Sequence, residues 1–246
     1  MATIVEMINP LTGLPEQVDK LDHTAQEIDD AVDLAPQLSN PNLLDNWYFG
    51  NPVNQRRQTS WLNPSNWQYA IDRWQITPSS VVALADDGIT ITADFQQGLE
   101  KGRLEFGRTY TFSVLSSDGR LGKHTFVITS DTNINVGLGL GYFVCYLDGD
   151  NVWLRIYGDG STYKAAKLEL GSTQTLAHRE GNKWVLNEIP DYGEQLARCQ
   201  RYFQTFATES LRPTNALDFR PVMRATPALS TITVSGKTLY TASADL

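Results

Sequence analysis

Aromatic rings interleaved with amides and arginines are the side chains whose types and spacing best fit a binding chemistry in this sequence. The stretch WYFGNPVNQRRQTSWLNPSNWQYAIDRW, residues 47–74, contains four of the six tryptophans of the chain. A saccharide site needs flat aromatic faces for the C–H side of a sugar ring and polar groups for its hydroxyls. The stretch supplies both, so it is the first candidate for saccharide binding, with packing in a β core as the alternative.

The tryptophans of this stretch fall into two groups. Trp74 alternates with Ile76 in a strand-like run, and Trp47 follows an entry segment, so these rings are expected in the core or at a subunit contact. Polar residues and proline surround the other two rings in TSWLNPSNWQ, which predicts a loop. The expected saccharide-binding residues are therefore Trp61 and Trp67, with Arg57 nearby; packing over the sheet or against a neighbouring subunit is the alternative.

A second aromatic strip is predicted in the run VWLRIY, residues 152–157. In a strand, side chains at every second position share a face. Trp153, Arg155 and Tyr157 would then lie together on the outer face, where they are further saccharide-binding candidates. Contact with a neighbouring chain is the competing interpretation.

Catalysis is not indicated by any local pattern. A glycoside hydrolase needs two acids on opposite sides of a cleft, and Asp72, Glu100, Glu105 and Glu169 could be nominated, but nothing in their context distinguishes them. The sequence has no Gly-x-Ser-x-Gly elbow and no P-loop. The glycine-rich GLGLGYF, residues 137–143, runs into a predicted strand, so no helix N-terminus is available for a phosphate. We expect a non-enzymatic protein with no catalytic residues.

Neither a metal site nor a cofactor is expected. The three histidines are widely spaced, and the two cysteines, Cys145 and Cys199, lie in apolar or aromatic surroundings that indicate buried thiols rather than ligands. The acids in LDGDN and YGDGS are explained by hairpin turns, because the ordered ligand positions of an EF-hand are missing. Calcium at these turns remains the open alternative.

Composition limits the class of protein. The chain has 246 residues, of which 41% are hydrophobic, enough for a real core. No apolar run approaches the roughly 18 residues of a membrane span, and Met1–Leu14 lacks the pattern of a secretory signal. Outside the acidic first 40 residues the charges nearly balance, so a nucleic-acid partner is disfavoured.

The acidic segment carries a heptad pattern. Residues 1–40 contain eight acids and one base, and their apolar residues follow alternating spacings of four and three, which is typical of a coiled coil beginning near Pro15 and ending before Pro36. The seam predicted to mediate oligomerisation consists of Leu14, Val18, Leu21, Ala25, Ile28, Val32 and Ala35.

This seam has two possible partners. It could pack on its own chain, or it could associate with copies of itself in a parallel bundle. Almost all positions outside the seam are polar, which favours the narrow seam of a bundle over the wider apolar face of a globular helix. The alanines leave the choice between two and three strands open.

Beyond residue 40 the pattern changes to short apolar runs separated by turn residues, which predicts an antiparallel β-sandwich, a jelly roll being the expected form. The sequence YFVCYLDGDNVWLRIY reads as a hairpin. The expected strands are Tyr69–Thr77, Val81–Ala85, Gly88–Ala93, Arg108–Leu115, Lys123–Thr129, Gly141–Leu147, Val152–Tyr157 and Lys164–Leu170.

The C-terminal residues 190–246 are expected to add strands to this sandwich or to begin a smaller β unit. Residues 190–206 fit a helix by the spacing of Leu196, Cys199 and Phe203, but their end fits a strand as well. The predicted organisation is a stem at 1–39, a jelly-roll sandwich at 40–189 and a β extension at 190–246.

Five ordered segments resemble a known family: NLLDNWYFGNPVNQR (42–56), YAIDRW (69–74), AKLELGSTQT (166–175), YGEQLARCQRYFQ (192–204) and RPVMRATPALS (220–230). Together they resemble tail-fibre-like receptor-binding proteins of phages and prophages, in which a helical stem carries a jelly roll similar to a carbohydrate-binding module. The family pattern often has glycine at the position of Arg57 and smaller or tyrosine-containing loops around Trp61 and Trp67, so the resemblance does not carry a binding specificity.

The resemblance implies a homotrimeric virion protein that attaches to host surface saccharide without catalysis. Its partners would be two further copies of the chain, other virion proteins through the N-terminal segment, and a host glycan, with no nucleic acid, no membrane insertion and no cofactor. A purely structural virion connector or capsid-decorating fibre is the first alternative, and a polysaccharide depolymerase is the second.

Overall fold

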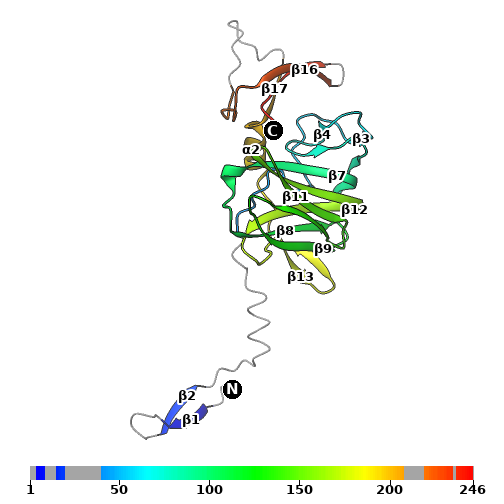
Figure 1. Cartoon of the computed structure of the whole chain (residues 1–246). Coiled ribbons are helices and arrows are strands. Elements are labelled where there is room, and N and C mark those ends of the chain that lie inside the picture. Colours follow the sequence, from blue (N-terminus) through cyan, green and yellow to red (C-terminus); the bar gives the residue numbers. More distant parts are fainter. Residues whose placement is uncertain (1–3, 9–14, 20–39, 208–218, 235–236, 246) are drawn as a thin grey trace. The chain divides into compact units, whose positions relative to one another are not determined.

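The computed structural model describes residues 4–8, 15–19, 40–207, 219–234 and 237–245 (Figure 1). The chain divides into two compact units, with the boundary between Leu38 and Ser39.

The first unit contains an antiparallel hairpin of β1 (Ile4–Ile8) and β2 (Pro15–Asp19), in which Ile4 pairs with Asp19 and Ile8 with Pro15. This corrects the start of the predicted helix, because Val18 of the seam lies in a strand opposite Val5. Pairing with the β-branched run at 4–8 satisfies backbone groups that the first turn of an isolated acidic helix leaves open. The other seam residues lie outside the described residues, so the coiled coil over them stays a prediction.

The second unit is mainly β with antiparallel sheets, consistent with a β-sandwich. Its large sheet is built from β3 (Ser60–Leu62), β4 (Gln68–Tyr69), β5 (Gln75–Ile76), β6 (Val81–Ala85), β7 (Gly88–Glu100), β8 (Thr109–Ser116), β9 (Leu121–Val127), β10 (Asn133–Gly137), β11 (Tyr142–Asp148) and β12 (Asn151–Leu170). A 3₁₀ turn, Lys101–Arg103, follows β7.

The long strands β7 and β12 connect the two parts of this sheet, since each pairs with strands of both parts. The path runs β10-β11-β12-β7-β5-β4, while β6 pairs with β3 and β7, and β8 pairs with β9 and β12. The register of β12 shifts between Asp159 and Thr162; residues before the shift pair with β11 and β7, and those after it pair mainly with β8. Such a bulge allows one strand to serve both layers of a sandwich.

The core lies between these two parts. The ring of Phe143 on β11 stacks on Phe112 of β8 with centroids 4.2 Å apart, although these strands are not paired. Trp74 stacks on Phe95 at 4.7 Å, and Phe49 meets Trp74 edge-on. The predicted core positions of Trp47 and Trp74 are confirmed, since both rings are buried.

Several predicted strands differ in extent. Tyr69–Thr77 is not one strand, because a tight turn with Arg73 at φ 73° separates β4 from β5. The two strands expected at 152–157 and 164–170 are one continuous strand, β12. β7 continues past Ala93 to Glu100, and β10 was not predicted.

The described residues of the C-terminal part form one helix and two small sheets. A hairpin pairs β13 (Ala177–Glu180) with β14 (Lys183–Leu186). Residues 190–206 form a helix followed by a strand: α2 (Tyr192–Gln200), whose N-cap is Asp191, then β15 (Phe203–Ala207). The strand β17 (Lys237–Ser243) lies between β15 and β16 (Ala228–Val234).

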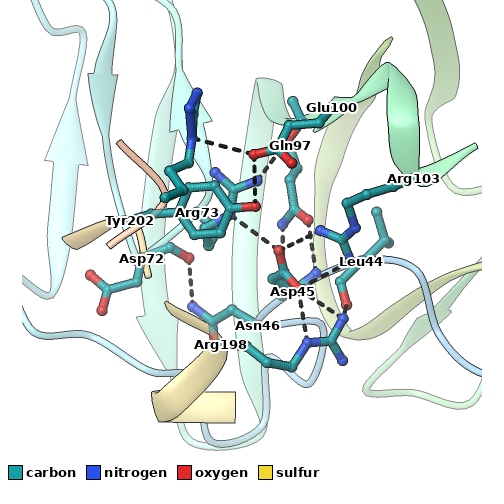
Figure 2. Close-up of polar contacts among 12 residues, drawn as sticks. Leu44, Asp45, Asn46, Asp72, Arg73, Gln97, Glu100, Arg103, Arg198 and Tyr202 are labelled. Carbon is teal, nitrogen blue, oxygen red and sulfur yellow. Dashed lines mark hydrogen bonds and ion pairs between the residues drawn. The ribbon is translucent and has the colours of Figure 1, made fainter. Parts of the chain in front are cut away.

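A buried ion network joins α2 to the sandwich (Figure 2). The carboxylate of Asp45 receives Nη1 of Arg103 at 2.8 Å, Nε of Arg198 at 2.9 Å and Nε of Arg73 at 3.3 Å. The guanidinium of Arg73 also lies 3.5 Å from the ring centre of Tyr202. The guanidinium of Arg224 lies 5.6 Å from the centre of the same ring, so the network brings together residues of the segments 42–56, 69–74, 192–204 and 220–230.

Candidate functional site

The candidate site lies on the face of the large sheet that points away from the core, across β7, β12, β11 and β10. Directly paired residues form a row on this face, from Gln96 to Arg155, Val144 and Asn135. The next row runs from Asp94 to Tyr157 and Tyr142. The inward-facing positions on either side of Arg155, Leu154 and Ile156, are fully buried, as the alternation of β12 predicts.

These two rows enclose a pocket of about 360 Å³, lined by Asp94, Asn135, Tyr142, Val144, Arg155 and Tyr157. The rings of Tyr142 and Tyr157 meet edge-to-face with centroids 6.5 Å apart, and they are 53% and 47% exposed. Large exposed aromatic rings next to fixed polar groups are the combination that recognises sugar rings and their hydroxyls.

Arg155 is held in place by three neighbours. Its Nε donates to Oε1 of Gln96 at 2.9 Å, and its Nη2 donates to the hydroxyl of Tyr146 at 3.1 Å. Its Nη1 forms an ion pair with Oδ1 of Asp94 at 3.3 Å. The guanidinium is therefore oriented before any ligand arrives, which reduces the ordering cost of binding.

The sequence candidates on β12 occupy different depths on this face. Arg155 and Tyr157 line the pocket, as their alternation predicted. Trp153 shares the face but is 9% exposed, and its ring covers Gly98 on β7, where an added Cβ would lie 3.1 Å from it. Trp153 thus supports the sheet next to the pocket and offers little of its ring to a ligand.

The two tryptophans predicted in the loop, Trp61 and Trp67, differ in exposure. Trp67 is 50% exposed, and the guanidinium of Arg155 lies 5.7 Å from its ring centre, so Trp67 lies next to the pocket. Trp61 is a correction: it is 1% exposed and belongs to the core, because the short strand β3 pairs with β6 and turns this ring inward while Leu62 faces solvent. A ring buried in this way cannot stack on a saccharide.

Arg57 does not line the pocket either. It is exposed, with a left-handed φ of 57°, in the turn that Asn54 closes through its carbonyl. The side chain of its neighbour Arg56 is mostly buried and forms ion pairs with Asp72 and Asp245, at 2.7 Å each.

The nominated carboxylates are dispersed. Asp72 and Glu169 are fully buried, Glu100 lies near Nε of Arg224 at 3.4 Å, and Glu105 pairs with Arg108 at 3.9 Å. In the described part of the chain, none of these four acids lines the aromatic pocket. The paired carboxylates of a glycoside hydrolase are not assembled there.

The two cysteines and the acids of the LDGDN and YGDGS turns lie outside the lining of the pocket. Cys145 and Cys199 are buried free cysteines, as predicted, and burial raises the pKa of Cys145 to about 12. Over the described ranges, no group of three or more His, Cys, Asp or Glu side chains is placed to hold a metal ion. Across the same ranges, no helix has the length and apolar character required to cross a bilayer.

A larger depression of about 650 Å³ lies at the end of β7, lined by Glu100, Lys101, Gly102, Asp150, Asn151 and Arg224. It contains charged and amide groups, but its described lining includes no aromatic ring. It lacks the stacking surface that distinguishes the Arg155 pocket.

Sequence reasoning missed Asp94, Asn135, Tyr142 and Tyr146. The hairpin predicted for YFVCYLDGDNVWLRIY was a usable signal, because its tight turn sets Tyr142 opposite Tyr157 and Tyr146 opposite Trp153. Asp94 lies just beyond the predicted end of its strand, and Asn135 lies on the strand that was not predicted, so neither had a local signal.

Comparisons of the chain with protein-family models, with curated proteins and with solved structures find no match.

Proposed function

We propose that this chain is a fibre-type virion protein that binds host surface saccharide, without catalysis, through the pocket around Arg155. In this proposal the second unit is a jelly-roll head, and the N-terminal segment both joins three copies and attaches them to other virion proteins. The virion assignment rests on the five family-like segments of the sequence.

One observation carries the saccharide assignment. Two half-exposed tyrosines and one half-exposed tryptophan surround an arginine whose orientation is fixed by Asp94, Gln96 and Tyr146. When a sugar covers exposed rings of this size, their apolar surface is removed from water, which favours binding. The amide and charged groups can form hydrogen bonds with the hydroxyls of the sugar.

Avidity supplies the affinity that one shallow pocket lacks. Linking several copies of a weak site raises apparent affinity by roughly 10²–10⁴ without any new contact. A trimeric stem would therefore turn weak single pockets into stable attachment to a surface that repeats the same glycan.

The test is binding of the purified protein to a glycan array and to host cell-wall polysaccharide. Tyr157→Ala should reduce binding at least roughly tenfold, because an aromatic contact and its buried area are lost. Phe106→Ala is the matched control, since Phe106 is 43% exposed and lies outside the pocket; it should bind as the unchanged protein does. No binding to any glycan, or equal losses in both variants, would contradict the proposal.

Two further outcomes separate the alternatives. Release of reducing ends from the polysaccharide on long incubation would establish a depolymerase. The structural connector is favoured by exposed apolar side chains in the C-terminal part, Val222 and Leu229. In a connector, Trp67 would be covered in the assembled particle, so a soluble quencher such as acrylamide would not reach it there.

A further inference from the structure

We infer that the Arg155 pocket selects an uncharged saccharide chain of more than one sugar ring, and discriminates against acidic sugars. This inference rests on the proposed saccharide-binding function and names its ligand class.

The charge of the pocket is already balanced within the protein. Asp94 and Arg155 are the two charged residues of its described lining, and they pair with each other at 3.3 Å. A carboxylate on the ligand would either lie beside Asp94 uncompensated or draw Arg155 away from it. Both cost free energy, because a desolvated charge without its own partner is unfavourable.

The hydrogen bonds of Arg155 reinforce this selection. Two nitrogens of the guanidinium donate hydrogen bonds to protein groups, Nε to Gln96 and Nη2 to Tyr146, whereas Nη1 lies 3.3 Å from Oδ1 of Asp94 in an ion pair. A bidentate grip on a carboxylate needs two parallel N–H groups directed at the ligand. The remaining N–H groups, the amide of Asn135 and the carboxylate of Asp94 suit single hydrogen bonds to hydroxyls.

The spacing of the aromatic rings sets the minimum length of the ligand. Trp67 lies beside Arg155 from the side of β4, whereas Tyr157 and Tyr142 lie one row further along β12 and β11. Tyr142 and Tyr157 line the pocket and Trp67 does not, so one sugar ring that stacks on the tyrosines inside the pocket does not also cover Trp67. A chain of two or more rings is needed to contact both surfaces.

The experiment compares neutral and acidic glycans that share a backbone, using the full-length protein. Lactose against sialyllactose, and galactan against galacturonan oligomers of one to four residues, are immobilised or titrated at equal concentration. We expect the neutral member of each bound pair to be preferred roughly tenfold, which is the size of one uncompensated charge contact near a surface. Affinity should rise from one to three rings.

Variants separate the two parts of the inference. Asp94→Asn removes the balancing charge and should shift the preference toward the acidic member, whereas Asp86→Asn, which removes an exposed acid in the β6–β7 turn, should not. Trp67→Ala should abolish the gain in affinity with ligand length. Phe106→Ala should keep the gain.

The outcomes distinguish this inference from the function on which it rests. Equal or stronger binding of acidic glycans, or an affinity that does not depend on length, overturns the inference and leaves saccharide binding intact. Absence of binding to every glycan overturns the proposed function as well. Thermal unfolding of each variant shows whether a loss reflects the pocket or a damaged fold.

Discussion

The guanidinium of Arg155 and the carboxylate of Asp94 face each other across β12 and β7, with Nη1 3.3 Å from Oδ1, in the lining of the aromatic pocket. Both side chains are less than a quarter exposed. The pair therefore has two consequences that can be measured separately: it stabilises this part of the sheet, and it sets the charge that a ligand meets.

The stabilising part is measurable in a double-mutant cycle of Asp94→Asn and Arg155→Gln. We expect a coupling of about 1 kcal/mol in the free energy of unfolding, because the residues are in contact and partly shielded from water. Urea titration of the four proteins gives this value. The same cycle on Asp118 and Arg120, a pair at 2.8 Å whose side chains are more than half exposed, is the control and should give a smaller coupling. A value for the pocket pair within error of zero would contradict the prediction.

Replacement of Asp45 by asparagine should destabilise the second unit by about 3–5 kcal/mol. Burial by itself raises the pKa of Asp45, but the charges of Arg73, Arg103 and Arg198 outweigh it and hold the pKa below its ordinary value. Removal of this carboxylate leaves Arg73, which is 1% exposed, without its counter-ion. Chemical unfolding measures the loss, and Asp118→Asn, at an exposed ion pair, should cost far less. A loss of less than about 1 kcal/mol would show that the network does not depend on Asp45.

Asp45 and Asp72 should respond to pH in opposite directions. Since the folded pKa of Asp45 is lowered, its contribution to stability is present above the unfolded value near 4 and disappears as the pH falls through the folded pKa. Complete burial raises the pKa of Asp72 to about 6, against the opposing effect of Arg56. The folded state then binds a proton that the unfolded state has released, so this group's contribution falls as the pH rises from about 4 to 6.

The Asp72 effect is isolated by comparison with Asp72→Asn. Between pH 4.5 and 7, the unchanged protein should lose roughly 2 kcal/mol more stability than the variant, because asparagine does not titrate. Urea unfolding at both pH values measures it, and other titrating groups cancel in the comparison. Asp86→Asn should behave like the unchanged protein. Equal pH dependence in the Asp72 variant would mean that Asp72 is ionised across this range.

The tryptophan assignments predict opposite results for Trp61 and Trp67. Trp61→Ala should cost about 3–5 kcal/mol of unfolding free energy, because it empties a filled core site, whereas Trp67→Ala should change stability little. In the unchanged protein, acrylamide should quench part of the tryptophan fluorescence, and this quenchable part should be missing in Trp67→Ala. If Trp61→Ala is stable and instead loses the quenchable fraction, the placement of Trp61 in the core is wrong.

The outer face of β12 could be predicted because it depends on a local rule. Alternation alone assigns Trp153, Arg155 and Tyr157 to one face and Leu154 and Ile156 to the other, and the structure has them so. Local pattern did not place Trp61, since a three-residue strand with polar flanks gives no indication of which face the sheet covers. The ring is turned inward by pairing with β6, about twenty residues further along the chain.

The charged clusters were even less accessible from sequence. Asp45 meets Arg198 across 153 positions, and Arg56 meets Asp245 across 189. Neither separation follows from periodicity or turn chemistry, and nothing local marks Ala93, with a φ of 67°, as part of a strand that continues to Asp94 and Glu100. Prediction of the pocket therefore requires the pairing register of β7, β12, β11 and β10, and the sequence indicated only the hairpin of β11 and β12.

The seam of the N-terminal segment predicts self-association, and the family resemblance sets the expected number of copies at three. The unchanged protein should scatter light as a particle of three times 27.5 kDa. Leu21→Asp combined with Ile28→Asp puts charges into the predicted apolar seam and should give a 27.5 kDa particle with an unchanged β spectrum. His23→Asp with Gln26→Asp adds two acids outside the seam and should leave the larger particle intact.

The seam variant should bind a short free oligosaccharide as well as the unchanged protein does. It should bind a polysaccharide surface roughly 10²-fold or more weakly, because only the linkage between pockets has been lost. If the unchanged protein is already a 27.5 kDa particle at high concentration, attachment cannot depend on multivalency, and the Arg155 pocket would have to supply the whole affinity alone.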